Sequence, residues 1–259
     1  MNADDLVREN EELKAELVRL REESSQYLQN VAHQLTAPLG AIKWSIEGLT
    51  TKANVSIERR KNLLSSIYNQ ATILVHLIKN FTLMSNLETD NELGQFREQP
   101  QPVDMLRLAI NLANDFQPQA FETKTSISVD EKSFRRTFKG GKLSVEKTLV
   151  SQAISNLLEN AVKYSDAGSE IAIDAIEDEY IALRVHSFGI PIADEERDRL
   201  FDRTYRGDGA RQRVPAGTGI GLYLVSHIMR LHRGSAGVEV SGRHSSFVLR
   251  FPKDCLTHE

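Results

Sequence analysis

NVAHQLTAPLGAI, residues 30–42, is the stretch around which the fold of this chain is organised. Its apolar spacing predicts a long amphipathic helix that carries His33. Pro38 follows five residues later; it removes one backbone hydrogen bond and predicts a bend one turn past the histidine. An exposed imidazole can attack a phosphoryl group through one ring nitrogen while a hydrogen bond holds the other. His33 is therefore a candidate phospho-acceptor, although a lone histidine is more often an ordinary surface residue.

A heptad pattern precedes this stretch. Its apolar positions recur every seven residues at Leu6, Leu13, Leu20 and Tyr27, with Leu17 and Val31 in the alternate seam. Asn10 shares the seam of Leu17, where a buried polar pair fixes register and favours two parallel strands. A lone solvated helix would not explain why the charged residues stay off this stripe. We expect residues 1–29 to form a coiled coil in a homodimer.

A helical hairpin is expected over residues 30–90. The first helix should continue to about Leu49, with a turn at Gly48 and the polar segment 50–54, and Ser56 is a reasonable N-cap for a second helix. The apolar stripe of that helix steps by three and four through Leu63, Ile67, Leu74, Leu77, Phe81 and Met84. Two antiparallel helices cannot bury such stripes alone, so a twofold axis should complete a four-helix bundle.

The remaining sequence predicts a second folding unit. Residues 91–102 are polar with two prolines and form the expected linker to a domain over residues 103–259. Its expected helices are 104–116, 145–165 and one from about Thr218; its expected extended segments are 126–129, 136–138, 170–176, 181–186, 236–240 and 246–251. This order favours an α/β sandwich with helices on one face of a mixed sheet. The fold class of the whole chain is thus α+β.

Composition excludes several classes of protein. The 259 residues are 40% hydrophobic and 26% charged, and the net charge of −4 with interspersed signs argues against nucleic-acid binding. Cys255 is the only cysteine, which excludes an intrachain disulfide and fits a reducing compartment. No apolar run approaches the roughly 18 residues that cross a bilayer, so no membrane segment and a cytoplasmic location are expected.

The segment SQAISNLLENAVKYS places chemically useful residues on one helix. Asn156 and Asn160 are four residues apart and share a helix face, while Lys163 and Tyr164 lie at its end. An amide oxygen is an acceptable Mg²⁺ ligand, and a nearby lysine offers charge to a phosphate. Two asparagines on a wet helix face would explain this segment equally well if it stood alone.

Two glycine-containing segments follow. GTGIGL, residues 217–222, puts glycines at the opening of a helix, where exposed N–H groups and the helix dipole suit a polyphosphate. Residues 207–216 contain Arg211 and Arg213 and suit a mobile lid whose arginines could reach phosphates. A solvated loop with incidental charge is the simpler alternative for this lid.

Together these segments resemble, in order, the boxes of sensor histidine kinases of two-component signalling. Residues 33–39 are similar to the phospho-acceptor box, the Asn156–Tyr164 helix to the N-box of the GHKL-type ATP-binding domain, residues 187–191 and 201–206 to its adenine-binding and aromatic boxes, and GTGIGL to its second glycine box. The resemblance implies ATP and Mg²⁺ as cofactors, with Asn160 on the metal. The implied cofactor-binding residues are Asn156, Asn160, Lys163, Tyr164, Ser187, Gly189, Ile192, Arg206, Gly217, Thr218, Gly219, Gly221 and Leu222.

The resemblance also implies an activity and a partner. An ATP-dependent protein-histidine kinase would phosphorylate His33 and pass the phosphoryl group to an aspartate on a response-regulator receiver domain. Sensor kinases often carry a sensing domain or membrane span ahead of the histidine helix, so this sequence is either a fragment or receives its input from a separate protein.

Three residues depart from the family pattern. Gln34 replaces the acid that follows the histidine; its amide can fix the ring tautomer but cannot take a proton, so autophosphorylation should be slower or more pH-dependent. Ala37 replaces the Thr or Asn that orients water, so phosphatase activity should be weak. Ser187 replaces the adenine-binding aspartate, and the loss of this charged acceptor should weaken adenine binding by ~1–2 kcal/mol. Pro191 stands where a second glycine is expected. A catalytically weak kinase-like scaffold and a histidine phosphotransferase remain as alternatives.

Overall fold

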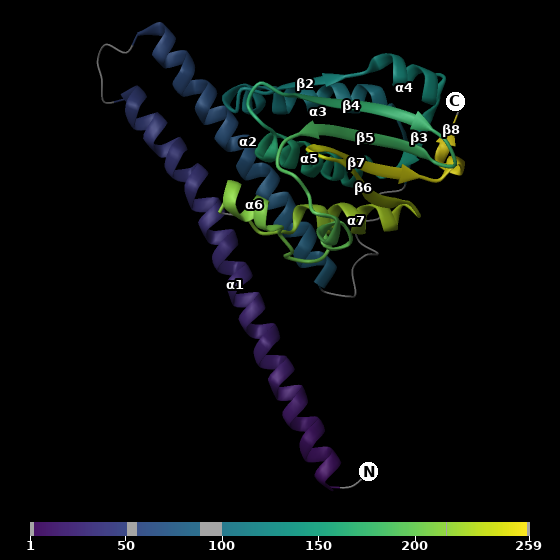
Figure 1. Ribbon diagram of the computed structural model, residues 1–259. Coiled ribbons are helices and arrows are strands. Elements are labelled where there is room, and N and C mark those ends of the chain that lie inside the picture. The colour runs from purple at the N-terminus through teal and green to yellow at the C-terminus, as the bar shows by residue number, and fades with distance from the viewer. Residues whose placement is uncertain (1–2, 51–55, 89–99, 216, 258–259) are drawn as a thin grey trace.

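The N-terminal part is a hairpin of two long helices. A computed structural model describes residues 3–50, 56–88, 100–215 and 217–257 (Figure 1). Helix α1 spans Ala3–Thr50 and helix α2 spans Ile57–Glu88, and the two lie antiparallel (Figure 1). The expected N-cap is confirmed, because Ser56 Oγ accepts the N–H of Arg59 at 3.3 Å. None of the helices in the described ranges is long and apolar enough to cross a membrane.

One detail of the hairpin differs from the prediction. Gly48 lies inside α1 and not in a turn, and a Cβ there would contact Leu63 of α2 at 3.4 Å. The glycine therefore marks a close approach of the two helices, which a sequence pattern cannot distinguish from a turn. Pro38 lies inside α1, and the helix continues past it as expected. Residues 51–55, most of the expected turn, lie outside the described residues.

The second unit is an α/β sandwich, which we call the nucleotide domain. Its five-stranded mixed sheet has the order β2-β4-β5-β7-β6. The strands are β2 (Ser126–Val129), β4 (Glu170–Glu177), β5 (Ile181–Phe188), β6 (Ser235–Ser241) and β7 (His244–Phe251). Only β2 and β4 pair in parallel, and the other neighbours are antiparallel. The expected mixed sheet is confirmed.

Helices cover one face of this sheet (Figure 1). They are α3 (Met105–Glu122), α5 (Lys147–Tyr164) and α7 (Gly221–Leu231). The core between the layers includes Ile154 and Leu158 of α5, Ile171 and Ile173 of β4, and Leu224 of α7. Alternate residues of β4 are buried, as expected for a strand whose second face is open. The layers thus place the C-terminal end of α5 next to the start of α7.

Several short elements were missed or misassigned in the sequence. A small antiparallel sheet joins β1 (Gln101–Val103), β3 (Lys142–Val145) and β8 (Leu256–Thr257). Strand β1 takes the last two residues of the expected linker, and β3 takes Val145, the expected first residue of a helix. Each strand has four residues or fewer, too short for a periodic pattern to reveal. Residues 89–99 of the linker lie outside the described residues.

The segment 136–138 is a correction: it is not extended but forms the end of helix α4 (Glu131–Phe138). Asp130 caps this helix through the N–H groups of Lys132 and Ser133. Phe134 and Phe138 are four residues apart and both are buried, which is the spacing of one buried helix face. A segment of three residues is too short to distinguish the period of a helix from the alternation of a strand.

Candidate nucleotide-binding site

A cleft opens between the C-terminal end of α5 and the beginning of α7. The predicted cofactor-binding residues that line it are Asn160, Lys163, Tyr164, Ser187, Gly189, Ile192, Arg206, Gly217, Thr218, Gly219, Gly221 and Leu222. They come from four separate stretches of sequence, residues 160–164, 187–192, 206 and 217–222. The structure therefore brings together all of the predicted set except Asn156, which does not line the cleft.

Asn160 and Lys163 project from the last turns of α5 into the cleft. Asn160 is half-buried, and its amide makes no hydrogen bond to any other residue that the structure describes. Lys163 Nζ lies 2.6 Å from Glu159 Oε1. Burial alone would lower the pKa of Lys163, but the charge of Glu159 and its hydrogen bond outweigh burial, so the pKa is raised above its ordinary value. The lysine is charged and already has a carboxylate partner.

Asn156 has a different role from the one predicted for it. It is only 1% exposed, and its Oδ1 accepts a hydrogen bond from Nδ2 of Asn80 on α2 at 2.8 Å. Its own Nδ2 donates to the carbonyl of Gly221 at 3.3 Å. The Oδ1 of Asn80 in turn accepts from Gln152 Nε2 at 2.7 Å. Asn156 thus joins the helical hairpin to the start of α7 instead of lining the cleft.

Ser187 has a hydroxyl partner that the sequence analysis missed. Strands β5 and β7 pair Ser187 with Ser245, and their Oγ atoms are 2.9 Å apart at the wall of the cleft. Where the family pattern has one carboxylate, this chain has two hydroxyls, each able to donate or accept. The register of β7 against β5 creates the pair, so no local motif could have revealed it.

Two glycines of the cleft wall are required by the backbone. At Gly219, φ is +69°, and a Cβ would lie 2.6 Å from the carbonyl carbon of Thr204. At Gly189, a Cβ would lie 2.0 Å from the carbonyl oxygen of Tyr164. The conformation of Gly219 also explains why α7 begins at Gly221 and not near Thr218, because positive φ ends a right-handed helix.

Arginines within and next to the lid form hydrogen bonds to other residues of the chain. The lid, residues 207–216 with Ala216 undescribed, contains the short helix α6 (Asp208–Arg213). The guanidinium of Arg206 donates to the lid carbonyls of Ala210 at 3.0 Å and Pro215 at 2.8 Å, and to that of Val214. Arg213 donates to the carbonyl of Ser165 at 2.6 Å, at the end of α5. Hydrogen bonds therefore hold the lid to Arg206 and to the end of α5.

Helix α1 contributes to the same cleft. Gln34 lines it, together with Leu77 and Asn80 of α2. With its amide oriented so that the oxygen faces the donors, Gln34 accepts the N–H of Gly217 at 3.3 Å and that of Thr218 at 3.0 Å. His33 is exposed and does not line the cleft. It precedes Gln34 by one residue, so its side chain leaves α1 about 100° further round the helix.

The sequence analysis did not identify Glu159, Leu77 and Asn80, which also line the cleft. Glu159 adjoins Asn160 and could have been found from the N-box itself. Leu77 and Asn80 belong to the apolar and polar positions of a different folding unit, so nothing in their local sequence points to the cleft. Only the docking of α2 against α5 and α7 brings them there.

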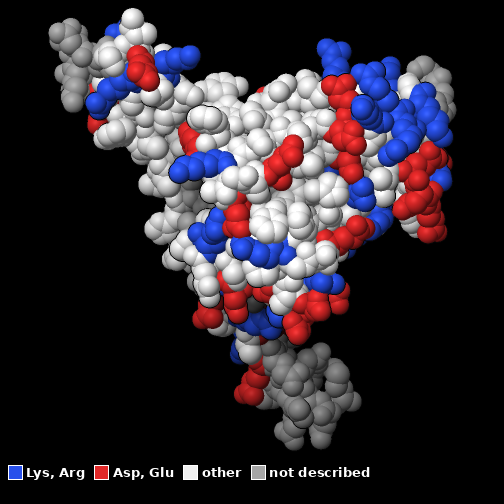
Figure 2. Space-filling model, turned by 45° about the horizontal axis from the view of Figure 1, so that its top comes forward, with Lys and Arg blue, Asp and Glu red and all other residues white. Residues whose placement is uncertain are grey.

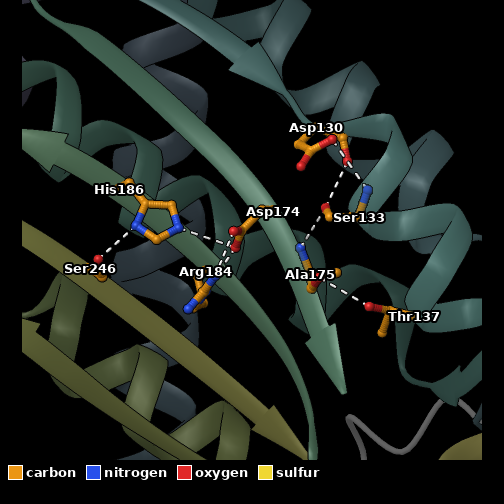
Figure 3. A network of polar contacts seen from close by, with 8 residues as sticks. All are labelled: Asp130, Ser133, Thr137, Asp174, Ala175, Arg184, His186 and Ser246. Atoms are coloured by element: carbon orange, nitrogen blue, oxygen red, sulfur yellow. Dashed lines mark hydrogen bonds and ion pairs between the residues drawn. The ribbon is translucent and has the colours of Figure 1, made fainter. Parts of the chain in front are cut away.

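A second polar cluster lies on the open face of the sheet (Figure 3). His186 bonds Ser246 Oγ through Nδ1 at 2.6 Å and Asp174 Oδ1 through Nε2 at 3.1 Å, and Arg184 forms a bidentate pair with Asp174 (Figure 3). Although a Ser, His and Asp are in contact, they sit on neighbouring strands whose backbone N–H groups belong to the sheet ladder. That arrangement offers no oxyanion donors, so we interpret the cluster as a cross-strand ladder.

Charged side chains on the nucleotide domain are mixed in sign. Figure 2 shows Lys and Arg groups next to Asp and Glu groups on the face in view. Around α4, for example, Arg135 pairs with Glu131 at 2.9 Å, and Lys139 and Lys253 both approach Glu177. Within the described residues, no group of three or more His, Cys, Asp or Glu side chains could hold a metal ion.

Fold and cleft define a GHKL-type nucleotide-binding domain attached to a histidine-bearing helical hairpin. Comparisons with family models agree: residues 145–254 match the histidine kinase-, DNA gyrase B- and HSP90-like ATPase family, and residues 23–90 match the His kinase A (phospho-acceptor) domain. The chain belongs to the sensor histidine kinase family.

Curated relatives include several sensor kinases. The chain is 30% identical over 235 residues to the phosphate regulon sensor protein PhoR of Pseudomonas aeruginosa, covering 90% of this chain and 51% of PhoR. It is 27% identical over 241 residues to SenX3 of Mycobacterium tuberculosis, covering 92% and 56%. The chain thus spans about half the length of these relatives. Among solved structures, full-length ShkA in complex with AMPPNP aligns with a TM-score of 0.53 at 20% identity, over 88% of this chain and 45% of ShkA.

Proposed function

We propose that this chain is the catalytic part of an ATP-dependent protein-histidine kinase that phosphorylates itself on His33. One observation carries the proposal: Gln34, the residue next to the exposed histidine, reaches the glycine loop (residues 217–221) of a cleft that also contains Asn160 and Lys163. An acceptor histidine and a phosphate-type cradle in one chain, with neighbouring residues in contact, suit phosphoryl transfer better than either feature alone.

In the proposed step, a ring nitrogen of His33 forms a bond to the γ-phosphorus of ATP. The bond from that phosphorus to the β,γ-bridging oxygen breaks, and ADP leaves with its electron pair. The proton on the other ring nitrogen passes to water, because the amide of Gln34 can accept a hydrogen bond but not a proton. The domain has to shift along the hairpin first, since His33 itself does not line the cleft.

The residues of the cleft fit a magnesium–nucleotide complex in which the protein supplies few of the metal ligands. Asn160 offers an amide oxygen with no protein partner among the described residues, whereas no carboxylate cage surrounds it. Mg²⁺ is commonly held in this way by one or two protein groups, substrate phosphates and waters. When bound, the ion supplies charge neutralisation for the phosphates. Lys163 and the N–H groups of the glycine loop would contact the same phosphates.

We propose a homodimer assembled through the hairpin. Exposed apolar residues on α1 share one helix face: Leu13, Leu17, Leu28, Leu39 and Ile46. A second stripe follows α2 through Leu64, Tyr68, Val75 and Ile78. Two uncovered stripes on adjacent helices suit a four-helix bundle with a second copy. The side chains of Leu6, Leu20 and Tyr27, which complete the expected heptads, lie outside the described residues.

Further parts of the proposal rest on the family alone. An aspartate on a response-regulator receiver domain would accept the phosphoryl group from His33. The domain bounds 1–29, 30–90, 91–102 and 103–259 and the cytoplasmic location stay predictions, as does the absence of nucleic-acid binding.

The test is labelling with γ-labelled ATP and Mg²⁺. Wild-type protein should acquire an acid-labile, base-stable label that His33→Ala abolishes, whereas His227→Ala, at a half-exposed histidine of α7, should keep it. A chain that binds ATP but never becomes labelled would be a scaffold. One that is labelled only by a phosphorylated partner protein would be a phosphotransferase.

A further inference from the structure

Several groups of the cleft that suit a triphosphate already have partners within the chain. Lys163 is paired with Glu159, and Arg206 is bonded to carbonyls of the lid. Of the two lid arginines, Arg211 is bonded to the carbonyl of Arg206 and Arg213 to that of Ser165. The N–H groups of Gly217 and Thr218 point at the oxygen of Gln34. A nucleotide entering this cleft would have to replace several of these contacts.

Gln34 differs from the other partners because it belongs to the hairpin and not to the nucleotide domain. Its neighbours on the same face of α1, Val31 and Leu35, line a small cavity together with Thr218 and Ile220. Val31 also packs against the buried core of the nucleotide domain. One face of α1 therefore rests directly on the glycine loop.

The docking of the hairpin is reinforced at two further points by polar contacts. Asn80 of α2 bonds to both Asn156 and Gln152 of α5. Further along α2, Asn69 Nδ2 donates to Glu122 Oε1 of α3 at 2.9 Å, and Asn69 is only 6% exposed. Leu83 and Met84 of α2 belong to the same buried core as residues of the nucleotide domain, so the docked interface combines polar and apolar contacts.

The docked arrangement also keeps His33 out of the cleft. Gln34 occupies the cradle while the histidine side chain leaves a different face of α1. The same contact that fills the phosphate position thus separates acceptor from donor.

We infer that the docked hairpin is an autoinhibitory contact in which the amide of Gln34 occupies the phosphate position of the glycine loop. Nucleotide and hairpin then compete for the N–H groups of Gly217 and Thr218. Because apparent affinity falls in proportion to the fraction of open molecules, loosening the docking should tighten nucleotide binding. The inference rests on the proposed function, since it takes the glycine loop as the phosphate cradle.

The experiment measures the dissociation constant of a fluorescent, non-hydrolysable ATP analogue with Mg²⁺ on the full chain. Gln34→Ala removes both hydrogen bonds and should tighten binding roughly three- to tenfold. Asn69→Ala lies outside the cleft and should also tighten it, by about two- to fivefold. Gln29→Ala, at an exposed position of α1, and Asn62→Ala, at an exposed position of α2, are matched controls that should leave the constant unchanged.

The outcomes separate the inference from the proposed function. Unchanged or weaker binding in Gln34→Ala overturns the inference even if the wild type labels His33 normally. Tighter binding in Gln34→Ala with wild-type affinity in Asn69→Ala would reduce it to a local effect and overturn the competition with docking. If neither the wild type nor any variant binds the analogue, the nucleotide site itself is wrong and both proposals fail.

Discussion

Asn80 on α2 and Asn156 on α5 are joined by a hydrogen bond of 2.8 Å that links the histidine-bearing hairpin to the nucleotide domain. Asn156 also holds the carbonyl of Gly221, so one buried amide connects three helices. This relationship separates the two asparagines of the N-box: Asn156 connects elements, whereas Asn160 faces the cleft.

Replacing the two asparagines should therefore have opposite consequences. Asn156→Ala leaves Nδ2 of the half-buried Asn80 and the carbonyl of Gly221 without their partner, and should lower the free energy of unfolding by about 1–3 kcal/mol. Asn160→Ala removes an amide that has no partner among the described residues, so stability should change little while labelling with ATP is lost. Urea unfolding followed by circular dichroism measures the first effect and γ-labelled ATP the second. Equal stability losses in the two variants would contradict this division of roles.

Gln34→Glu should accelerate autophosphorylation. A carboxylate can accept the proton that the amide cannot, so at saturating ATP the initial rate should rise by at least about tenfold. Gln29→Glu adds the same charge to α1 at an exposed position outside the cleft and should leave the rate unchanged. Initial rates of His33 labelling check the prediction, which fails if both variants behave alike.

Ala37→Thr should strengthen the phosphatase activity, which we expect to be weak in the wild type. Ala37 is exposed and lies one helical turn after His33, where a hydroxyl could orient water toward a docked receiver domain. The measurement is the ATP-independent loss of phosphate from a receiver domain that this protein can phosphorylate. Ala37→Val is the control, because valine has the shape of threonine without the hydroxyl. Rapid loss with the wild type, abolished by a substitution of His33 or Gln34, would refute the expectation of weak phosphatase activity.

Ser187→Asp should tighten ATP binding and favour ATP over GTP. The carboxylate would stand where the wall of the cleft now has the Ser187–Ser245 hydroxyl pair, and could accept hydrogen bonds from both Ser245 and an adenine amino group. A gain of about 1–2 kcal/mol corresponds to roughly five- to thirtyfold in the dissociation constant. Competition of ATP and GTP for a fluorescent analogue measures it. An equal gain in affinity for GTP would mean that residue 187 does not distinguish adenine from guanine.

Asp174 should make stability sensitive to acid. Burial alone would raise the pKa of Asp174, but hydrogen bonds from His186 and Arg184 outweigh burial and hold the pKa well below its ordinary value. The stabilisation is therefore complete above the unfolded pKa of about 3.9 and is lost as pH falls toward the folded value. The free energy of unfolding should decline below about pH 4 more steeply in the wild type than in Asp174→Asn. If the free energy of unfolding depends on pH equally in both proteins, the contacts of Asp174 in Figure 3 do not make stability sensitive to acid.

Sequence by itself determined the helical hairpin, the mixed sheet and most residues of the cleft, because each is encoded by a periodic or contiguous stretch. The N-box helix, the glycine loop and Ser187 could be found in this way, and all contribute to one cleft. The segment 136–138 and the three short strands were missed because they contain too few residues to show a period.

Only the tertiary structure decided which of these residues touch one another. The pairing of Ser187 with Ser245 depends on strand register, and the burial of Asn156 depends on the position of α2. The contact of Gln34 with Gly217 and Thr218 joins positions more than 180 residues apart in the printed sequence. Contacts between distant segments leave no mark on the local pattern of either segment, because their energy arises only when the packed layers bring the two surfaces together.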